Sequence, residues 1–70
     1  MGNRWEEIRS RILEENTKEE LYGLTSKARV PIVVSIRQQW KDNGRMSDKQ
    51  AAVLAGWLAS EELEYGDEED

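Results

Sequence analysis

The chain has 70 residues, which allows a single domain with a small hydrophobic core. It contains neither Cys nor His, which excludes disulfides, thiolate and imidazole metal sites, Cys nucleophiles and the most common general base. We therefore predict a non-enzymatic protein that uses no cofactor and no metal. No apolar run reaches the roughly 20 residues of a membrane-spanning helix, and the start of the chain lacks the apolar centre of a signal peptide. These features predict a cytoplasmic protein.

The net charge of -5 is unevenly distributed along the chain. Residues 61–70 hold seven acidic groups and no basic one, so the remainder has 10 basic groups against 8 acidic ones. Between Thr25 and Gln50 there are six basic residues and two acidic ones. The body of the protein is thus mildly basic, and its C-terminal end is strongly acidic.

The first predicted helix begins after Asn3, because Asn accepts hydrogen bonds from the free N–H groups of a helix start. The apolar residues that follow recur with the 3.6-residue period of a helix, and charged residues fill the opposite face. The apolar face consists of Trp5, Ile8, Ile12 and Leu13.

A second, short helix is predicted after Thr17, which forms a capping box with Glu20. Gly23 is expected to end this helix, since glycine readily closes helices. Its apolar face is thin, so the helix is expected to return the chain toward the next one. That face contains Leu21, Tyr22 and Leu24.

The segment from Val30 to Ser60 reads as two amphipathic helices joined by a tight turn. Pro31 fits the first position of a helix, where its missing N–H has no partner to lose. Gly44 is expected to end this helix, and Ser47 with Gln50 forms the capping box that opens the next. The predicted buried stripes are Ile32, Val33, Ile36 and Trp40 on the first helix, and Ala51, Leu54, Trp57 and Leu58 on the second.

The predicted fold is all-α, a small four-helix bundle with a helix-turn-helix core over residues 1–60. The composition of residues 61–70 cannot support burial, so we predict a disordered acidic tail there. The β-branched run from Val30 to Ile36 is also compatible with a buried strand. No second strand is predicted with which it would pair, and this favours the helix.

The turn between the two central helices is one candidate site for an anionic ligand. A helix N-terminus attracts phosphate through its free N–H groups, and Arg45 and Lys49 flank this one. The layout resembles a helix-hairpin-helix, although only Gly44 of the two expected glycines is present and Asp48 adds a negative charge. The alternative is a connecting turn whose polar groups only cap the helix and contact water.

A basic surface is the second candidate, since Arg37 and Lys41 lie four residues apart on one predicted helix. With the turn they would form a surface that follows a nucleic-acid backbone, and its binding would weaken with salt. A helix face that is merely solvated is the alternative. The predicted nucleic-acid-binding residues are Arg37, Lys41, Gly44, Arg45 and Lys49.

The acidic end and one tryptophan are the candidates for contact with a partner protein. Core packing accounts for the three tryptophans, but Trp57 lies beside the apolar stripe and is the best candidate for an exposed surface. The acidic end would bind a basic partner, compete with nucleic acid or serve solubility alone. It lacks the glycine and alternating oxygen ligands of a calcium loop. Its members are Glu61, Glu62, Glu64, Asp67, Glu68, Glu69 and Asp70.

The central segment from Ser35 to Leu54, with its helix, glycine turn and Ser-x-Lys-Gln helix start, resembles a recurrent phage segment. It is also similar to the small accessory proteins encoded beside the UvsW helicase in T4-like phages. The resemblance covers about the middle third to half of the chain. It implies a dynamic four-helix bundle akin to the nucleic-acid-binding module of the RuvA junction protein, and a helicase-associated role in recombination or replication in the host cytoplasm. Gly44, Arg45 and Lys49 are the positions it places nearest to the nucleic-acid backbone.

Two hypotheses follow. The first is a small accessory protein that binds nucleic acid weakly and works with a helicase or other DNA-processing protein. The second is an acidic protein-interaction module, or DNA mimic, that modulates a basic partner.

Overall fold

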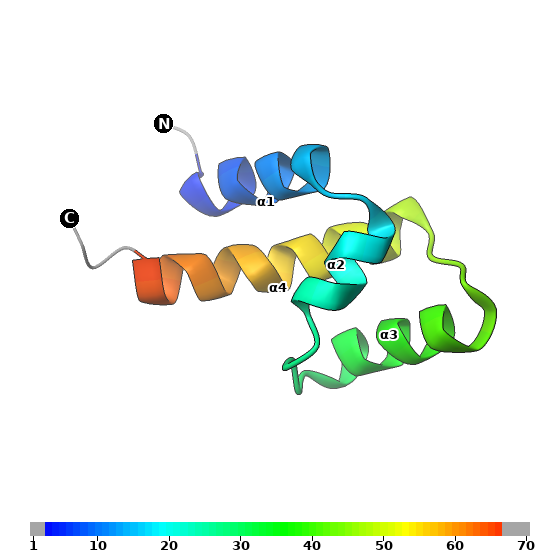
Figure 1. Ribbon diagram of the computed structural model, residues 1–70. Helices are drawn as coiled ribbons and strands as arrows, with labels where there is room; N and C mark the ends of the chain where they lie inside the picture. Colours follow the sequence, from blue (N-terminus) through cyan, green and yellow to red (C-terminus); the bar gives the residue numbers. More distant parts are fainter. Residues whose placement is uncertain (1–2, 67–70) are drawn as a thin grey trace.

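The computed structural model describes the backbone of residues 3–66 and the side chains of residues 3–64. Over this range the chain forms four helices and no strand (Figure 1). The predicted all-α fold is confirmed, and the β-branched run after Val30 is helical. The helices are α1 (Arg4–Glu15), α2 (Lys18–Leu24), α3 (Pro31–Asn43) and α4 (Asp48–Gly66).

Helix α4 is the common neighbour of the other three helices. It contacts α1, α2 and α3, and its contact with α1 is the most extensive. Figure 1 shows α1 lying along α4, α2 crossing it, and α3 on the side away from α1. The arrangement is consistent with the predicted small bundle. The helix-turn-helix of α3 and α4 is present, but the largest packed pair is α1 with α4.

Local capping signals set most of the helix boundaries. The Asn3 side chain accepts hydrogen bonds from the N–H groups of Trp5 (3.0 Å) and Glu6 (3.3 Å) at the start of α1. The Thr17 capping box with Glu20 opens α2 with both of its hydrogen bonds formed. These caps confirm the two predicted helix starts.

The turn between α3 and α4 also follows its sequence signals. Gly44 has a left-handed φ of 67°, and its N–H donates to the Trp40 carbonyl at 2.7 Å. The N–H of Ser47 donates to Oε1 of Gln50 at 2.9 Å, and the N–H of Gln50 donates to Oγ of Ser47 at 3.1 Å. The predicted capping box is therefore formed.

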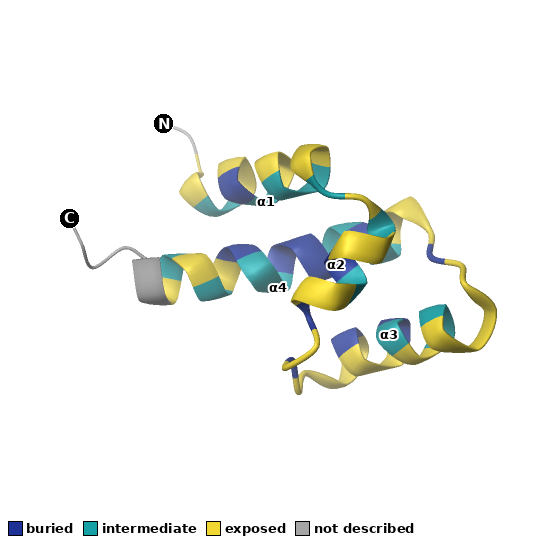
Figure 2. Ribbon diagram, in the orientation of Figure 1, coloured by how far each residue is buried: buried dark blue, intermediate teal, exposed yellow. Residues whose placement is uncertain are grey.

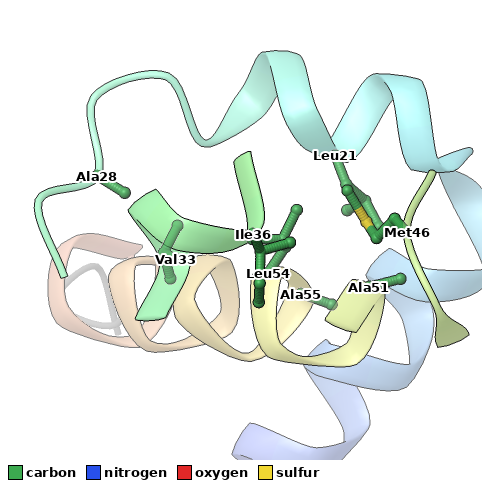
Figure 3. Close-up of a cluster of buried hydrophobic side chains, with 8 residues drawn as sticks. All are labelled: Leu21, Ala28, Val33, Ile36, Met46, Ala51, Leu54 and Ala55. Carbon is green, nitrogen blue, oxygen red and sulfur yellow. The ribbon is translucent and has the colours of Figure 1, made fainter. Parts of the chain in front are cut away.

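The core lies where α2, α3 and α4 meet, and Ala28 adds to it from the loop that joins α2 to α3 (Figure 3). Figure 2 shows buried positions concentrated on α4 and exposed outer surfaces on α1 and α3. Alanines recur every four residues on α4 at positions 51, 55 and 59, and small side chains allow a neighbouring helix to approach closely. The buried core residues are Leu21, Ala28, Val33, Ile36, Met46, Ala51, Leu54 and Ala55.

Two predictions about burial and helix length are corrected. Ile32 is predicted in the core but is 55% exposed, because the α3 face that meets α4 is centred on Val33 and Ile36. Helix α2 ends at Leu24, one residue beyond the predicted stop at Gly23, whose φ is not positive.

The predicted disordered tail does not begin at residue 61, because α4 continues to Gly66. Glu and Leu are good helix formers, and adding a residue to an existing helix gains a hydrogen bond without a new nucleation step. Glu61 and Leu63 are also half-buried. Of the predicted tail acids, Glu61, Glu62 and Glu64 therefore lie on α4, and Asp67, Glu68, Glu69 and Asp70 lie outside the described residues.

Within residues 3–66, none of the helices combines the length and the apolar character that crossing a bilayer requires.

Candidate functional site

Arg37, a predicted nucleic-acid contact, is instead engaged inside the protein. Its Nε donates to the carbonyl of Tyr22 (3.2 Å) and to Oγ1 of Thr25 (3.1 Å). Its guanidinium carbon lies 4.2 Å from the centre of the Tyr22 ring, a cation–π distance. Arg37 is half-buried and connects α3 to the end of α2. We therefore leave it out of the candidate nucleic-acid surface.

Thr25 is the partner of Arg37 that the sequence did not reveal. It is fully buried, and its hydroxyl donates to the Leu21 carbonyl at 2.8 Å while accepting from Arg37. In the sequence it begins a polar connecting segment, so nothing marks it as buried. Its burial depends on the fold of α2 against α3 and α4.

The other predicted cations, Lys41, Arg45 and Lys49, are exposed around the α3–α4 turn. Lys41 lies in the last turn of α3, Arg45 follows the exposed Gly44, and Lys49 lies in the first turn of α4. These three cations therefore lie on consecutive segments at the end of α3, in the turn and at the start of α4, a region that we call the cationic corner.

The same corner carries polar contacts that limit its use as a phosphate site. Asp48 forms an exposed ion pair with Lys18 at 3.3 Å, and the capping box already occupies the N–H groups of Ser47 and Gln50. The Gln39 amide donates to Oε1 of Gln50 at 3.0 Å, which links the end of α3 to the start of α4. The corner therefore offers exposed charged side chains on a braced turn, with two of its backbone N–H groups already taken by the capping box.

A second surface is an apolar groove between α1, α4 and the start of α3, with a volume of about 490 Å³. Two large apolar residues of its lining are exposed, Ile32 at 55% and Val30 at 40%. Trp57, the predicted partner-binding tryptophan, is half-buried in the lining. We call this surface the α1/α4 groove; it is lined by Trp5, Arg9, Val30, Ile32, Val33, Ala52, Val53, Gly56, Trp57 and Ser60.

One wall of the α1/α4 groove depends on Trp5 crossing Gly56. The Trp5 Nε1 donates to the Gly56 carbonyl (3.1 Å) and to Oγ of Ser60 (3.0 Å). A Cβ at position 56 would lie only 2.9 Å from Cζ2 of Trp5, so the close approach requires glycine. Gly56 lies inside a predicted helix, where glycine is unfavourable unless packing requires it. This is the only signal in the sequence that points to its role.

The two surfaces differ in chemistry: the corner of Lys41, Arg45 and Lys49 offers charge to a polyanion, and the α1/α4 groove offers apolar and aromatic area to another apolar surface.

Comparisons of the chain with protein families, with curated proteins and with solved structures found no match.

Proposed function

We propose that the chain is a non-enzymatic protein-interaction module that receives an apolar segment of a partner protein in the α1/α4 groove. The observation that carries this proposal is the mainly apolar lining of the groove, in which Ile32 is more than half exposed. Contiguous exposed apolar surface in a small soluble domain commonly marks a binding site. Tryptophan is also enriched among the residues that contribute most to protein–protein affinity.

The groove is a better candidate for a binding site than the cationic corner, because the two surfaces differ in the free energy of their exposure to water. Burying apolar surface gains about 25 cal/mol of free energy per Å². An apolar groove that stays exposed to water lacks this gain, and a partner that covers the groove would supply it. Exposed Lys and Arg side chains are favourably solvated and need no partner. The groove is therefore the feature that a binding function explains.

A charge placed in the groove is expected to abolish partner capture. Ile32→Glu puts a carboxylate where an apolar side chain would be covered, and Val34→Glu makes the same change at a 46% exposed position of α3 outside the groove. Tagged chains are expressed in cells, cross-linked and purified, and the captured proteins are identified by mass spectrometry. A partner retained by Val34→Glu and lost with Ile32→Glu supports the proposal. Identical captured sets for the two variants contradict it.

A second candidate function is weak nucleic-acid binding at the α3–α4 turn. It is favoured by the exposure of Lys41, Arg45 and Lys49 on consecutive segments around Gly44. The resemblance to helicase-associated phage proteins would place such binding in recombination or replication. This role is independent of the groove, since the two surfaces share no residue.

Two substitutions on α3 separate a nucleic-acid contact from a structural one. Lys41→Gln is expected to lower the slope of log K against log salt by about 1 for duplex DNA, with unfolding free energy changed by no more than about 0.5 kcal/mol. Arg37→Gln is expected to leave that slope unchanged and to lower the unfolding free energy by about 1–2 kcal/mol, because hydrogen bonds and the Tyr22 contact are lost. Fluorescence anisotropy at several salt concentrations and urea titration measure the two quantities. The absence of binding to single-stranded, duplex and branched DNA at low salt would remove this candidate.

A further inference from the structure

We propose that the segment received by the α1/α4 groove is an amphipathic helix that carries a carboxylate facing Arg9. This inference rests on the proposed function and specifies its partner. It follows from the length of the groove, the chemistry of its walls and its single charge.

The length of the groove suits two turns of helix. Along α4 it extends from Ala52 to Ser60, which at about 1.5 Å per residue is about 12 Å. Apolar side chains at positions i, i+4 and i+7 of a docked helix span about 10.5 Å by the same measure. Three apolar anchors of one helix therefore fit along the groove.

The walls favour a helix over an extended segment. An added strand gains affinity from main-chain hydrogen bonds to a free sheet edge. Here the lining comes from α1, α4, and Val30 with the first turn of α3, and backbone groups within helices are already paired with each other. A helix brings its own backbone hydrogen bonds and needs only side-chain contact.

The charge of the groove selects an acidic partner. Arg9 is the one charged residue in the lining, and its Nε is buried without a hydrogen-bond partner among the described residues. Its guanidinium carbon lies 5.3 Å from the centre of the Trp5 ring, and its stem would meet a Cβ at Gly56 at 3.5 Å, so the side chain is held against the wall. Nε itself is closed to a docked side chain, so a carboxylate on the docked helix would accept from the terminal nitrogens of the half-buried guanidinium. Docking also excludes water from this contact, which strengthens it.

A second copy of the chain satisfies this charge less well. In a two-fold dimer each copy presents the same surface, so packing groove against groove duplicates the cation. The lining holds no acidic residue to complement it. Charge complementarity thus points to a different protein.

The test uses a phage-displayed library of 18-residue helical peptides with fixed Leu at i, i+4 and i+7 and randomised flanking positions. Selection is made on the full chain. A selected peptide and its Glu→Gln analogue are then synthesised and titrated against the wild type, Arg9→Met, Arg11→Met and Ile32→Glu. Arg9→Met keeps the apolar stem, and Arg11→Met removes an exposed cation of α1 that does not line the groove.

We expect enrichment of one acidic flank position and loss of binding with Ile32→Glu. Arg9→Met and the Glu→Gln analogue are each expected to weaken binding about tenfold, with no further loss when combined, and Arg11→Met to leave it unchanged.

Peptides that bind in the groove with no acidic preference, and equally to Arg9→Met, would overturn this inference while the proposed function stands. Peptides that bind regardless of Ile32→Glu, or none that bind, would count against both. Dimerisation of the wild type that Ile32→Glu abolishes in sedimentation equilibrium would overturn the inference in favour of a second copy.

Discussion

Replacing Leu21 by Ala is expected to unfold a large share of the protein at 25 °C. Leu21 is 1% exposed and lies in the core cluster, so its truncation removes buried apolar area and leaves a cavity. Such changes cost about 2–5 kcal/mol. A core of this size rarely supplies more than about 3–5 kcal/mol of net stability. Urea titration followed by circular dichroism measures the loss.

Leu24 supplies the matched control, because it is the same residue type on the same helix but is 52% exposed. Leu24→Ala is expected to change the unfolding free energy by less than about 1 kcal/mol. Equal losses for the two variants would show that the burial of α2 differs from the arrangement described.

Adding one methyl group at Gly56 is expected to destabilise the protein, although Ala is the better helix former. The new Cβ would meet the Trp5 ring at 2.9 Å and disturb the hydrogen bond from Nε1 of Trp5. Overpacking costs about 1–3 kcal/mol, and helix propensity returns up to about 1 kcal/mol. The net loss of about 1–2 kcal/mol corresponds to a fall in Tm of roughly 5–15 °C. Thermal unfolding monitored by circular dichroism tests this.

The opposite sign is expected at Gly23, which also lies within a helix but has open space around it, since an added Cβ would meet nothing within 4 Å. Gly23→Ala is expected to raise stability by up to about 1 kcal/mol, because no contact opposes the gain in helix propensity. A fall in Tm for Gly23→Ala, or a rise for Gly56→Ala, would contradict the role given to the crossing of Trp5.

The sequence predicted those parts of the fold that depend on local interactions. The caps at Asn3, Thr17 and Ser47 and the left-handed Gly44 are formed within a few residues of chain, so their residue types are sufficient to indicate them. The all-α class follows from the same signals combined with the 3.6-residue apolar period.

The surfaces were less predictable because they depend on contacts between distant segments. Ile32 satisfies the apolar period of α3 but falls on the side that α4 does not cover. Arg37 has the sequence character of an exposed cation, and only the position of Tyr22 and Thr25 in space gives it internal partners. Trp57 lies at the edge of its predicted stripe, and the structure gives it both roles, since it packs partly buried against the core and also lines the α1/α4 groove.

The placement of α4 among the other three helices has a consequence for synthesis on the ribosome. The hydrogen bond between Trp5 and Gly56 connects positions 51 residues apart, and each of the first three helices contacts the last one. A nascent chain that ends before α4 lacks the surface on which these helices pack, so the core forms only after α4 has emerged from the ribosome. Until then the apolar side of α1 is open to chaperones or to other chains.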